Sequence, residues 1–525
     1  MSPLSIVHVT TEYAPLVRIG GRADMVGGLA REQARRGHRV LVVLPHYAAI
    51  AMPAGVTRTP LGGVDVPWGM GRERATFDLI ETGADEPRLL LVGHAGARGF
   101  YARSGVYDDP ETGAAYGDNA ERFVFFARAA LEALKKTGET FDVLHAHDHQ
   151  AAWVPCFART HDAAAPAFAG LATVFTIHNL GYQGLYDSWV LALAGFAPDQ
   201  FFPGAVFEFW GRVNFMKIGI AFADHVTTVS PRHAREIKKT PEFGYGLEGL
   251  LARRAADLTG VLNGIEDAWD PASDPLIAER YDAGKLAGKA QSRAALAAEC
   301  GFDVPAAWPL VGVSAGLEEQ KGWDLVLQAA GELKQMEARF VFMGRGQPRF
   351  RDELRALADA DPDRIFFREA RDQGFLHRML AGCDLLLVPS RFEPCGLNQM
   401  VAQRYGTAPV VHAVGGLADS VEEFDPLGGT GTGFLFERFE AGEMTAALRR
   451  ALALARQPEL WAGLQRRAMT RDFSWRRPAD EYDAIYAAAR AKVAKCGAPT
   501  LASVRELIEV HAADAGRASG AGEKG

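Results

Sequence analysis

The sequence predicts an α/β fold made of two Rossmann-like, doubly wound domains that face each other across a cleft. At 525 residues the chain is too long for one ordinary core. Short β-branched runs alternate with longer helical stretches, the order that gives parallel sheets covered by helices. Most of these runs are apolar throughout, as strands buried on both faces are.

The expected strands fall into two series. The first series lies at residues 5–10, 38–44, 143–146, 173–177 and 226–229. The second lies at residues 261–262, 310–313, 340–343, 365–367, 385–388 and 408–411. Because the pattern restarts near residue 260, we expect an N-terminal domain over 1–259 and a C-terminal domain over 260–477. A helix over 478–495 is expected to pack back on the first domain, ahead of a disordered tail at 498–525.

Composition and charge narrow the class of protein. The chain is 48% hydrophobic and 23% charged, as globular enzymes are, and its net charge of −8 argues against nucleic acid as a partner. No apolar run approaches the roughly 18 residues that cross a bilayer, so we expect no membrane partner. The five cysteines are scattered without a CxxC pair. This favours a reducing cytoplasm over a disulfide framework or a zinc site.

A glycine-rich segment follows the first expected strand. It reads Arg18-Ile-Gly-Gly-Arg-Ala-Asp-Met-Val-Gly-Gly-Leu29. Gly20 and Gly21 would let the backbone approach a ligand, and Arg18 suits a phosphate. Glycine turns are also common without a ligand, so a purely structural turn remains the alternative.

The third strand ends in a histidine-rich segment, Leu144-His-Ala-His-Asp-His-Gln150. Extended residues at spacing two share one face, so His145, His147 and His149 could form a metal site, as in some metal hydrolases. No later cluster of His and Asp completes a metal shell. We therefore favour polar residues that line a cleft, and we expect no metal.

Polar residues also follow the next strand, in Thr176-Ile-His-Asn-Leu-Gly-Tyr-Gln-Gly184. His178 alone would read as a hydrogen-bonding strut. Asn179, Tyr182 and Gln183 beside it predict a loop that binds sugar, because amides and aromatic faces suit hydroxyl-rich ligands.

The second half carries further candidates at strand ends. Lys321, in Glu319-Gln-Lys-Gly322, could hold a phosphate as a point charge or be an ordinary exposed lysine. Gly344-Arg-Gly346 lacks the third glycine of a nucleotide fingerprint. Glu393, in Pro389-Ser-Arg-Phe-Glu-Pro-Cys-Gly-Leu397, can accept hydrogen bonds from sugar hydroxyls. Val414-Gly-Gly-Leu-Ala-Asp419 begins a helix that suits a diphosphate.

Together these segments closely resemble the bacterial glycogen synthases and plant starch synthases, from about residue 4 to about residue 490. The resemblance is carried by several ordered segments. They are His145-Ala-His-Asp-His, Phe175-Thr-Ile-His-Asn-Leu-Gly-Tyr-Gln-Gly, Gly246-Leu-Glu-Gly-Leu, Gly260-Val-Leu-Asn-Gly-Ile, Ser390-Arg-Phe-Glu-Pro-Cys-Gly-Leu and Gly415-Gly-Leu-Ala-Asp. The resemblance implies a GT-B fold and a retaining glucosyltransferase that moves glucose from ADP-glucose to the 4-hydroxyl of an α-1,4-glucan. It also implies that neither a metal nor another cofactor is needed.

The resemblance assigns roles by position. Asp148 and His178 would line the glucose and acceptor side, Lys321 would bind the diphosphate, and Glu393 would contact the donor glucose. Other donor-binding residues would be Arg18, Gly20, Gly21, Asn263, Cys395, Gly396, Leu397, Gly415 and Gly416. Asn179, Tyr182 and Gln183 would lie on the acceptor side.

Three positions depart from the family pattern. Gly316 stands where the family has a diphosphate-binding arginine, Arg22 where it has a leucine, and Asn398 where it has a threonine. Loss of one transition-state donor costs on the order of 10²–10³ in rate. A catalytically impaired relative that binds glucan or nucleotide sugar is therefore the alternative function. We hypothesise that Arg22 restores the missing charge near the diphosphate; otherwise it points to solvent.

Overall fold

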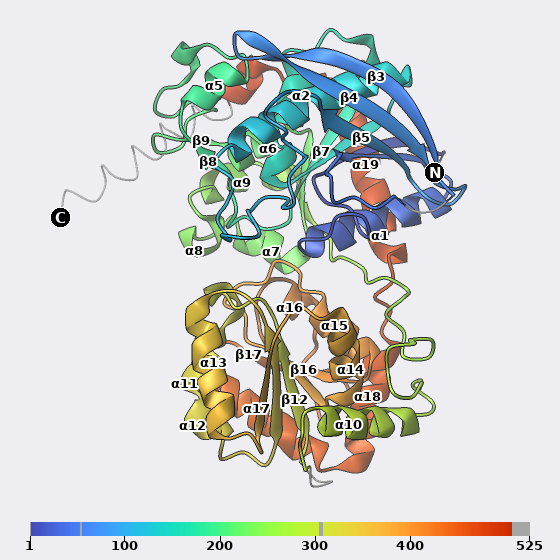
Figure 1. Cartoon of the computed structure of the whole chain (residues 1–525), viewed down its shortest axis with the longest axis vertical. Helices are drawn as coiled ribbons and strands as arrows, with labels where there is room; N and C mark the ends of the chain where they lie inside the picture. Colours follow the sequence, from blue (N-terminus) through green and yellow to red (C-terminus); the bar gives the residue numbers. More distant parts are fainter. Residues whose placement is uncertain (1, 53–54, 304–307, 507–525) are drawn as a thin grey trace, which may run out of the picture. The chain divides into compact units, whose positions relative to one another are not determined.

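The computed structural model describes residues 2–52, 55–303 and 308–506, which form two compact units. Unit 1 comprises Met1–Val229, Ala234–Gly264 and Trp475–Gly525, and unit 2 comprises Ser230–His233 and Ile265–Ser474. The chain thus leaves unit 1 at Gly264 and returns to it at Trp475 (Figure 1). Both units are α/β domains built on mainly parallel sheets, as the sequence predicts.

Unit 1 is built on a nine-stranded sheet. In sheet order its strands are β11 (Leu258–Gly260), β10 (His225–Thr228), β7 (Ala172–Ile177), β6 (Val143–His147), β1 (Ser5–Val9), β2 (Arg39–Pro45), β5 (Arg88–His94), β4 (Gly71–Glu81) and β3 (Thr57–Trp68). Every residue of β1, β6 and β7 is buried, so their apolar residues need not alternate with polar ones, and the polar His8, His145 and His147 are buried with them. The strand order reverses between β1 and β6, and this is the switch point where such sheets bind ligands.

The helices of unit 1 complete its core. They are α1 (Gly21–Arg35), α2 (Asn119–Thr137), α3 (Asp148–Ala151), α4 (Trp153–Arg159), α5 (Trp189–Leu193), α6 (Phe215–Phe222), α8 (Pro241–Gly244), α9 (Glu248–Arg253) and α19 (Arg476–Cys496). α7 (Pro231–Glu236) spans residues of both units, and a small ladder pairs β8 (Leu185–Tyr186) with β9 (Val213–Asn214). α19 packs against α1 and β7, so the returning helix lies on this unit.

Unit 2 has a fully parallel six-stranded sheet. In sheet order its strands are β14 (Ile365–Glu369), β13 (Arg339–Gly344), β12 (Leu310–Ser314), β15 (Leu385–Val388), β16 (Ala408–His412) and β17 (Phe434–Phe436). The switch point of this sheet lies between β12 and β15. Buried apolar side chains such as Trp323, Phe342 and Leu448 form its core.

Helices cover both faces of the unit 2 sheet. Figure 1 shows α11, α12 and α13 on one side and α10, α14 and α15 on the other. The helices are α10 (Ala287–Glu299), α11 (Trp323–Gln328), α12 (Ala330–Leu333), α13 (Pro348–Ala360), α14 (Gln373–Gly382), α15 (Asn398–Arg404), α16 (Gly415–Ser420), α17 (Ala441–Ala455) and α18 (Pro458–Thr470).

Three expectations about the strands need correction. The strand predicted at residues 261–262 lies at Leu258–Gly260 and pairs with β10, so it closes the first sheet rather than opening the second. The sequence reading missed β3, β4 and β5, and β3 and β4 run antiparallel at one edge of the unit 1 sheet. It also missed the short β17. β3 is partly exposed and lacks the continuous apolar run by which other strands were found, whereas β5 is buried and does carry such a run at residues 89–92.

The tail is described only in part. Residues 501–506 are helical and Val504 is buried, so this stretch is ordered, whereas the sequence predicted disorder. The remainder of the predicted tail, residues 507–525, lies outside the described residues. Among the helices that the structure describes, none combines the length and apolar character needed to cross a membrane. No disulfide links cysteines in the described chain.

Candidate functional site

A buried cluster of charged side chains surrounds Arg22 at the switch point of the unit 1 sheet. Nη1 of Arg22 donates to Asp148 Oδ2 at 2.9 Å and to Gln150 Oε1 at 2.6 Å. Nη2 of Arg22 donates to Glu12 Oε1 and, at 2.5 Å, to the hydroxyl of Tyr107. The Arg22 side chain is 6% exposed. One buried cation is therefore matched by two carboxylates, which follow β1 and β6.

Burial and pairing together set the ionisation of this cluster. Burial would lower the pKa of Arg22, but Glu12 raises it, so the guanidinium stays charged. Burial would raise the pKa of Glu12, yet Arg22 and the backbone N–H groups of Gly20 and Ile19 lower it. For Asp148 burial outweighs Arg22, and the pKa is raised. Glu12 is thus the permanent counter-ion of Arg22, and Asp148 is the carboxyl that takes up a proton more readily.

The structure brings together two residues that the resemblance places on the glucose and acceptor side, Asp148 and His178. Asp148 begins α3 directly after β6, with a left-handed φ of 57° that asparagine and aspartate tolerate best. Its Oδ1 accepts the backbone N–H of His178 at 2.8 Å, which ties the end of β6 to the end of β7. His178 is half-buried, and burial followed by the nearby Arg22 holds its pKa well below the usual range. His178 is therefore a neutral imidazole.

The predicted phosphate-binding turn of unit 1 is occupied by side chains of the protein. The N–H groups of Ile19 and Gly20 donate to Glu12 Oε2 at 3.0 and 2.9 Å. Arg18 is paired with Asp24 at 2.9 Å, with its side chain 40% exposed. Gly21 begins α1, and a Cβ at Gly20 would meet no atom within 4 Å. The backbone donors of this turn thus serve Glu12 rather than standing open for a ligand.

The alternative that Arg22 points to solvent is wrong, because its side chain is 6% exposed. The hypothesis that Arg22 replaces a missing diphosphate cation stays a prediction, and the contacts of Arg22 argue against it. Arg22 is buried, and its charge is balanced by Glu12 and Asp148. A cation in this state cannot turn toward a phosphate without leaving two carboxylates unpaired in the interior. In this structure Arg22 binds and orients the carboxylate of Asp148.

The predicted sugar-binding loop divides into buried and exposed parts. Gln183 is buried, accepts from Asn214 Nδ2 at 2.6 Å and donates to the Tyr245 carbonyl, so it is a structural strut. Asn179 Oδ1 accepts the N–H of Gly181 at 3.0 Å within the turn. Tyr182 is 57% exposed and presents an aromatic face of the kind that stacks on sugars.

Asn263, the predicted donor contact near the end of the first unit, is buried with one unsatisfied atom. The residue is 5% exposed. Within the described part of the chain, its Oδ1 has no hydrogen-bond partner. A buried amide oxygen without a partner is uncommon and marks a position where an outside donor would be stabilising.

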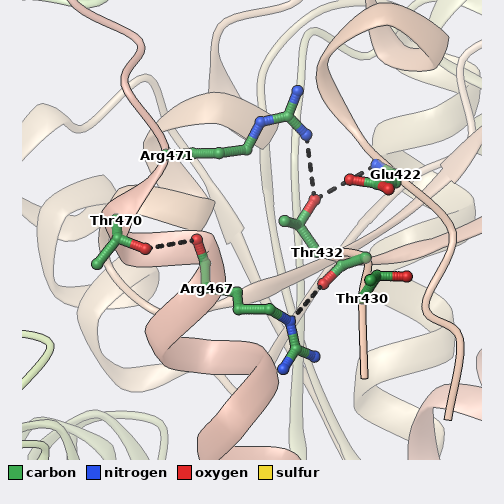
Figure 2. A pocket seen from close by; sticks show the side chains of 7 residues that line it. Glu422, Thr430, Thr432, Arg467, Thr470 and Arg471 are labelled. Atoms are coloured by element: carbon green, nitrogen blue, oxygen red, sulfur yellow. Dashed lines mark hydrogen bonds between the residues drawn. The ribbon is translucent and has the colours of Figure 1, made fainter. Parts of the chain in front are cut away.

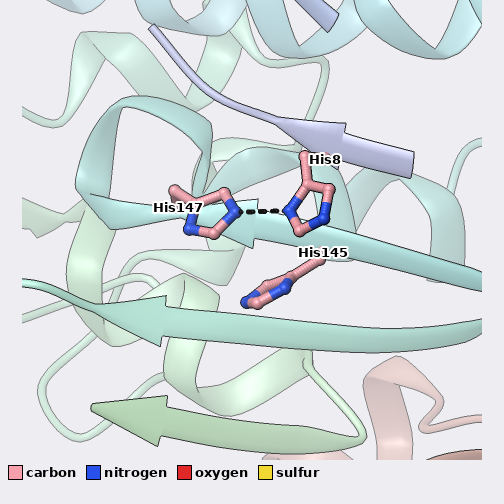
Figure 3. Close-up of side chains that lie close together, drawn as sticks. All are labelled: His8, His145 and His147. Carbon is pink, nitrogen blue, oxygen red and sulfur yellow. Dashed lines mark hydrogen bonds between the residues drawn. The ribbon is translucent and has the colours of Figure 1, made fainter. Parts of the chain in front are cut away.

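The histidines of the His-x-His strand form a different group from the one expected. His8 of β1 joins His145 and His147, whereas His149 lies in α3 and its Nδ1 bonds to the Tyr182 carbonyl at 2.8 Å. Figure 3 shows the three rings close together. Every ring nitrogen of the trio already has a hydrogen-bond partner. In this structure the three histidines therefore form part of a hydrogen-bonded network.

At the switch point of the unit 2 sheet, Lys321 and Glu393 meet. Lys321 follows β12 and Glu393 follows β15, and Lys321 Nζ lies 2.7 Å from Glu393 Oε2. The same oxygen accepts from the hydroxyl of Ser390 at 3.0 Å. The Lys321 side chain is 24% exposed and that of Glu393 11%, so the pair is accessible from one side.

Two glycines of unit 2 permit a close approach of loops at this pair. A Cβ at Gly415 would lie 2.1 Å from the Glu393 carbonyl, and one at Gly416 would lie 2.1 Å from the Cys395 carbonyl. The Gly416 N–H donates to the Glu393 carbonyl at 3.0 Å. The predicted donor-binding residues Cys395, Gly396, Leu397, Gly415 and Gly416 are thus brought beside Glu393. Asn398 donates from Nδ2 to the Ser314 carbonyl at 3.0 Å, which fastens α15 to the end of β12.

Arg345 lies beside Gly316, and the sequence reading did not select it. Ser314 pairs with Met343 and Leu317 with Gly346, so the same register places residue 345 opposite residue 316. The Leu317 N–H donates to the Arg345 carbonyl at 3.2 Å. Arg345 is exposed, and no hydrogen bond or ion pair of its side chain occurs within residues 2–52, 55–303 and 308–506.

The site residues that sequence reasoning missed had weak signals. Arg345 lies in Gly344-Arg-Gly346, which was set aside as an incomplete nucleotide fingerprint. Glu12 and Tyr107 carry no local pattern that points to Arg22, because Arg22 lies 10 residues from Glu12 and 85 residues from Tyr107 along the chain. His8 is a polar residue inside an otherwise apolar strand, and that is a signal that could have been followed.

A separate polar pocket of about 430 Å³ lies in unit 2. Figure 2 shows Arg467 and Arg471 among its lining residues. Arg467 Nε donates to the Gly431 carbonyl at 3.2 Å, and Arg471 Nη1 to Thr432 Oγ1 at 3.4 Å. None of the residues predicted from the sequence as site residues lines this pocket.

Comparison with known proteins places the chain among enzymes that build glucans. Residues 5–253 match the family model described as the starch synthase catalytic domain, and residues 306–465 match glycosyl transferases group 1. A glycogen synthase of Anaeromyxobacter sp. (strain Fw109-5) is 44% identical over 92% of this chain and 99% of its own length. A glycogen synthase of Koribacter versatilis (strain Ellin345) is 39% identical over 93% and 98%.

A solved structure agrees with these matches. The catalytic domain of starch synthase IV from Arabidopsis thaliana, bound to ADP and acarbose, superposes with a TM-score of 0.85 at 30% identity. The match covers 93% of this chain and 100% of that one. Sucrose-phosphate synthase from Thermosynechococcus elongatus shares the fold, with a TM-score of 0.58 at 18% identity.

Proposed function

The chain belongs to the glycogen synthase family of glycosyltransferases, and we propose that it transfers glucose from ADP-glucose to the non-reducing end of an α-1,4-glucan. The anomeric configuration is retained, and neither a metal nor another cofactor takes part. Support for the donor comes from the Arabidopsis starch synthase IV, which was solved with ADP and acarbose. Support for the polymer comes from relatives named glycogen synthase that match over nearly their whole length.

The single observation that carries the proposal is the Lys321–Glu393 pair at the switch point of the unit 2 sheet. Nζ and Oε2 lie 2.7 Å apart, and both side chains retain some exposure. A nucleotide sugar needs both charges: a cation for the diphosphate and a carboxylate for hydroxyls or a developing positive charge. Glycines 415 and 416 keep the neighbouring backbone close to Glu393.

The chemistry follows from charge. As the bond from glucose C1 to the phosphate oxygen breaks, the leaving ADP gains negative charge and the sugar becomes oxocarbenium-like. Lys321 stabilises the first charge and Glu393 the second. A bond then forms from C1 to the acceptor 4-hydroxyl oxygen on the same face. The departing phosphate takes the hydroxyl proton. Because the acceptor attacks the face from which ADP leaves, the anomeric configuration is retained.

Arg345 supplies the second cation for the diphosphate. The family resemblance expects an arginine at position 316, and Gly316 cannot provide it. Arg345 stands opposite that position on the neighbouring strand, where side chains of paired residues point to the same face. Its exposed guanidinium can reach a phosphate without first breaking an ion pair.

The cluster of unit 1 serves the sugar. Arg22 and Glu12 hold Asp148, and Asp148 in turn holds the backbone of His178. His178 and the exposed ring of Tyr182 then face the sugar. Arg22 acts here as a positioning residue, because its guanidinium is already paired with Glu12 and Asp148 inside the protein.

The test measures incorporation of labelled glucose into glycogen from ADP-glucose and from UDP-glucose, each with and without EDTA. We expect incorporation from ADP-glucose that EDTA does not change. Lys321→Met should lower it by about 10²-fold, the usual cost of a transition-state donor. The matched control Lys285→Met, at an exposed lysine of the same unit, should leave it unchanged. Absence of incorporation from either donor would contradict the proposal, and loss of activity in EDTA would contradict its metal-free part.

A further inference from the structure

A continuous series of hydrogen bonds runs from His178 through the interior of unit 1 to α19. Nε2 of His178 lies 3.0 Å from Nδ1 of His147, and Nε2 of His147 lies 3.0 Å from Nδ1 of His8. Nε2 of His8 lies 2.8 Å from Gln33 Oε1, and Gln33 Nε2 donates to the Tyr486 hydroxyl at 3.1 Å. We call these five side chains the histidine network.

Further hydrogen bonds lead from Tyr486 along the strands, beyond the five members of the network. The Tyr486 hydroxyl lies 2.8 Å from Nδ1 of His145, and Nε2 of His145 lies 2.5 Å from Thr176 Oγ1. Thr176 in turn bonds to Thr227 at 2.5 Å. Each of these residues is fully buried, so water cannot compete for their hydrogen bonds.

The three imidazoles of the network are neutral. Burial lowers the pKa of His8 to about 4, although Gln33 acts in the opposite direction. Burial, followed by neighbouring histidines, holds the pKa of His147 well below the usual range. A neutral imidazole has one N–H and one bare nitrogen, so each ring can donate once and accept once.

The amide of Gln33 therefore gives the network a direction. Its Oε1 carries no hydrogen, so Nε2 of His8 must donate to it and Nδ1 of His8 must accept from His147. Nδ1 of His147 is then bare and accepts from Nε2–H of His178. His178 is left with a bare Nδ1, and no hydrogen bond to that atom occurs among the described residues.

We propose that Gln33 and Tyr486 are positioning residues that fix the tautomer of His178, so that His178 meets its ligand with a hydrogen-bond acceptor. The amide of Gln33 turns Nε2 toward the Tyr486 hydroxyl and Oε1 toward His8, and each proton position along the network follows from that orientation. The ligand group that suits a bare imidazole nitrogen is a hydroxyl. In a glucosyltransferase it is a hydroxyl of the bound sugar, and this last step rests on the proposed function.

The direct test is the nitrogen spectrum of the full chain labelled with ¹⁵N-histidine. The signal of His178 is identified by its loss in a His178→Ala variant. We expect the Nε2–H tautomer in the wild type and a mixture of both tautomers in Tyr486→Phe, which frees the amide to turn. A His178 ring protonated on Nδ1 in the wild type would overturn the proposal without any variant.

The functional test compares Tyr486→Phe with Tyr482→Phe, a buried tyrosine one turn earlier in α19 whose hydroxyl lies outside the network. Tyr486→Phe should lower kcat/KM for glucose transfer by roughly three- to tenfold, the range of one neutral hydrogen bond. Tyr482→Phe should change neither this value nor the tautomer. Equal losses in both variants would show that packing, and not the network, is responsible.

Sugar analogues identify the hydroxyl. Wild type and Tyr486→Phe are compared on ADP-sugars that each lack one hydroxyl, and on a maltooligosaccharide that lacks its terminal 4-hydroxyl as a binding competitor. The analogue without the recognised hydroxyl should remove the difference between the two proteins. A difference that persists with every analogue would overturn recognition of a sugar hydroxyl. If the wild type transfers no glucose at all, the proposed function fails, while the nitrogen spectrum still decides the network.

Discussion

The two units have the same strand order around their first strand, yet they use their switch points differently. In unit 1 the switch point is filled by Arg22, which is buried and paired with Glu12 and Asp148. In unit 2 it holds the partly accessible pair Lys321–Glu393, with the exposed Arg345 one strand away. The same topology thus gives two different sites. In unit 1 the charged groups are paired with one another in the interior, and in unit 2 they remain accessible to a ligand.

Burial decides which of these roles a cation can take. Removing one partner of a buried ion pair leaves an uncompensated charge in a poorly polarisable interior, which costs about 3–5 kcal/mol. Exposed pairs contribute a median of ~0–1 kcal/mol. A buried cation is therefore expected to control stability and geometry, whereas an exposed one can control rate at little cost to the fold.

The largest effect is expected for Arg22→Leu. The change leaves Glu12 and Asp148 buried together without a cation, so the free energy of unfolding should fall by about 3–5 kcal/mol. Urea denaturation at pH 7 measures it. Arg22→Leu combined with Glu12→Gln should recover part of the loss, because one orphaned charge is removed. A loss below 1 kcal/mol would show that the cluster does not hold this switch point together.

The next effect concerns rate. Arg345→Ala should lower kcat by on the order of 10²–10³, the cost of one transition-state donor, with no change in the urea midpoint. Gly316→Arg in that background should restore activity, since a Cβ at Gly316 meets only the flexible end of Glu318, at 3.0 Å. Arg349→Ala, an exposed arginine of α13, is the matched control. Failure of Gly316→Arg to rescue would remove Arg345 from the diphosphate site.

The contrast also explains what could be predicted from the sequence. Most strands that are buried on both faces can be recognised in the sequence as apolar runs. The fold class could therefore be predicted, and so could the strand ends that carry Asp148, His178, Lys321 and Glu393. Asp148 lies at the switch point of the unit 1 sheet, and Lys321 and Glu393 lie at that of the unit 2 sheet, because the strand order reverses at those two places. No single segment displays that order.

The sequence did not show whether a charged residue is buried and paired or exposed to solvent. Arg18 and Arg22 lie four positions apart in one glycine-rich segment, and nothing local separates them. The structure makes one exposed and the other buried, because Arg22 meets Glu12, Tyr107 and Asp148 from three distant segments. Pairings over such distances along the chain depend on tertiary packing, which residue spacing does not encode.

The third prediction uses pH to separate the interior of unit 1 from its surface. His8 has a folded pKa of about 4 against 6.5, so between these values the unfolded chain binds a proton that the folded one refuses. Stability should therefore fall as the pH drops from 6.5 to 4, by about 3 kcal/mol for His8 alone.

The carboxyls of the cluster act at lower pH and with opposite signs. The lowered pKa of Glu12 removes further stability on acidification, whereas the raised pKa of Asp148 offsets part of it. Urea denaturation from pH 7 to pH 4 measures the slope. His8→Gln should flatten it by up to one proton, and an unchanged slope would mean that His8 does not titrate as proposed.

The smallest effect is expected for Arg18→Ala, at the exposed end of the comparison. Arg18 is paired with Asp24 on the surface, so its removal should change the free energy of unfolding by less than about 1 kcal/mol. If Arg18 also contacts the donor, as the resemblance implies, the KM for ADP-glucose should rise while the urea midpoint stays in place. Asp24→Asn separates the two roles, because it loosens the pair but keeps the arginine. A large loss of stability in Arg18→Ala would mean that Arg18, like Arg22, stabilises unit 1. Exposure would then not distinguish the roles of these two arginines, although they lie only four residues apart.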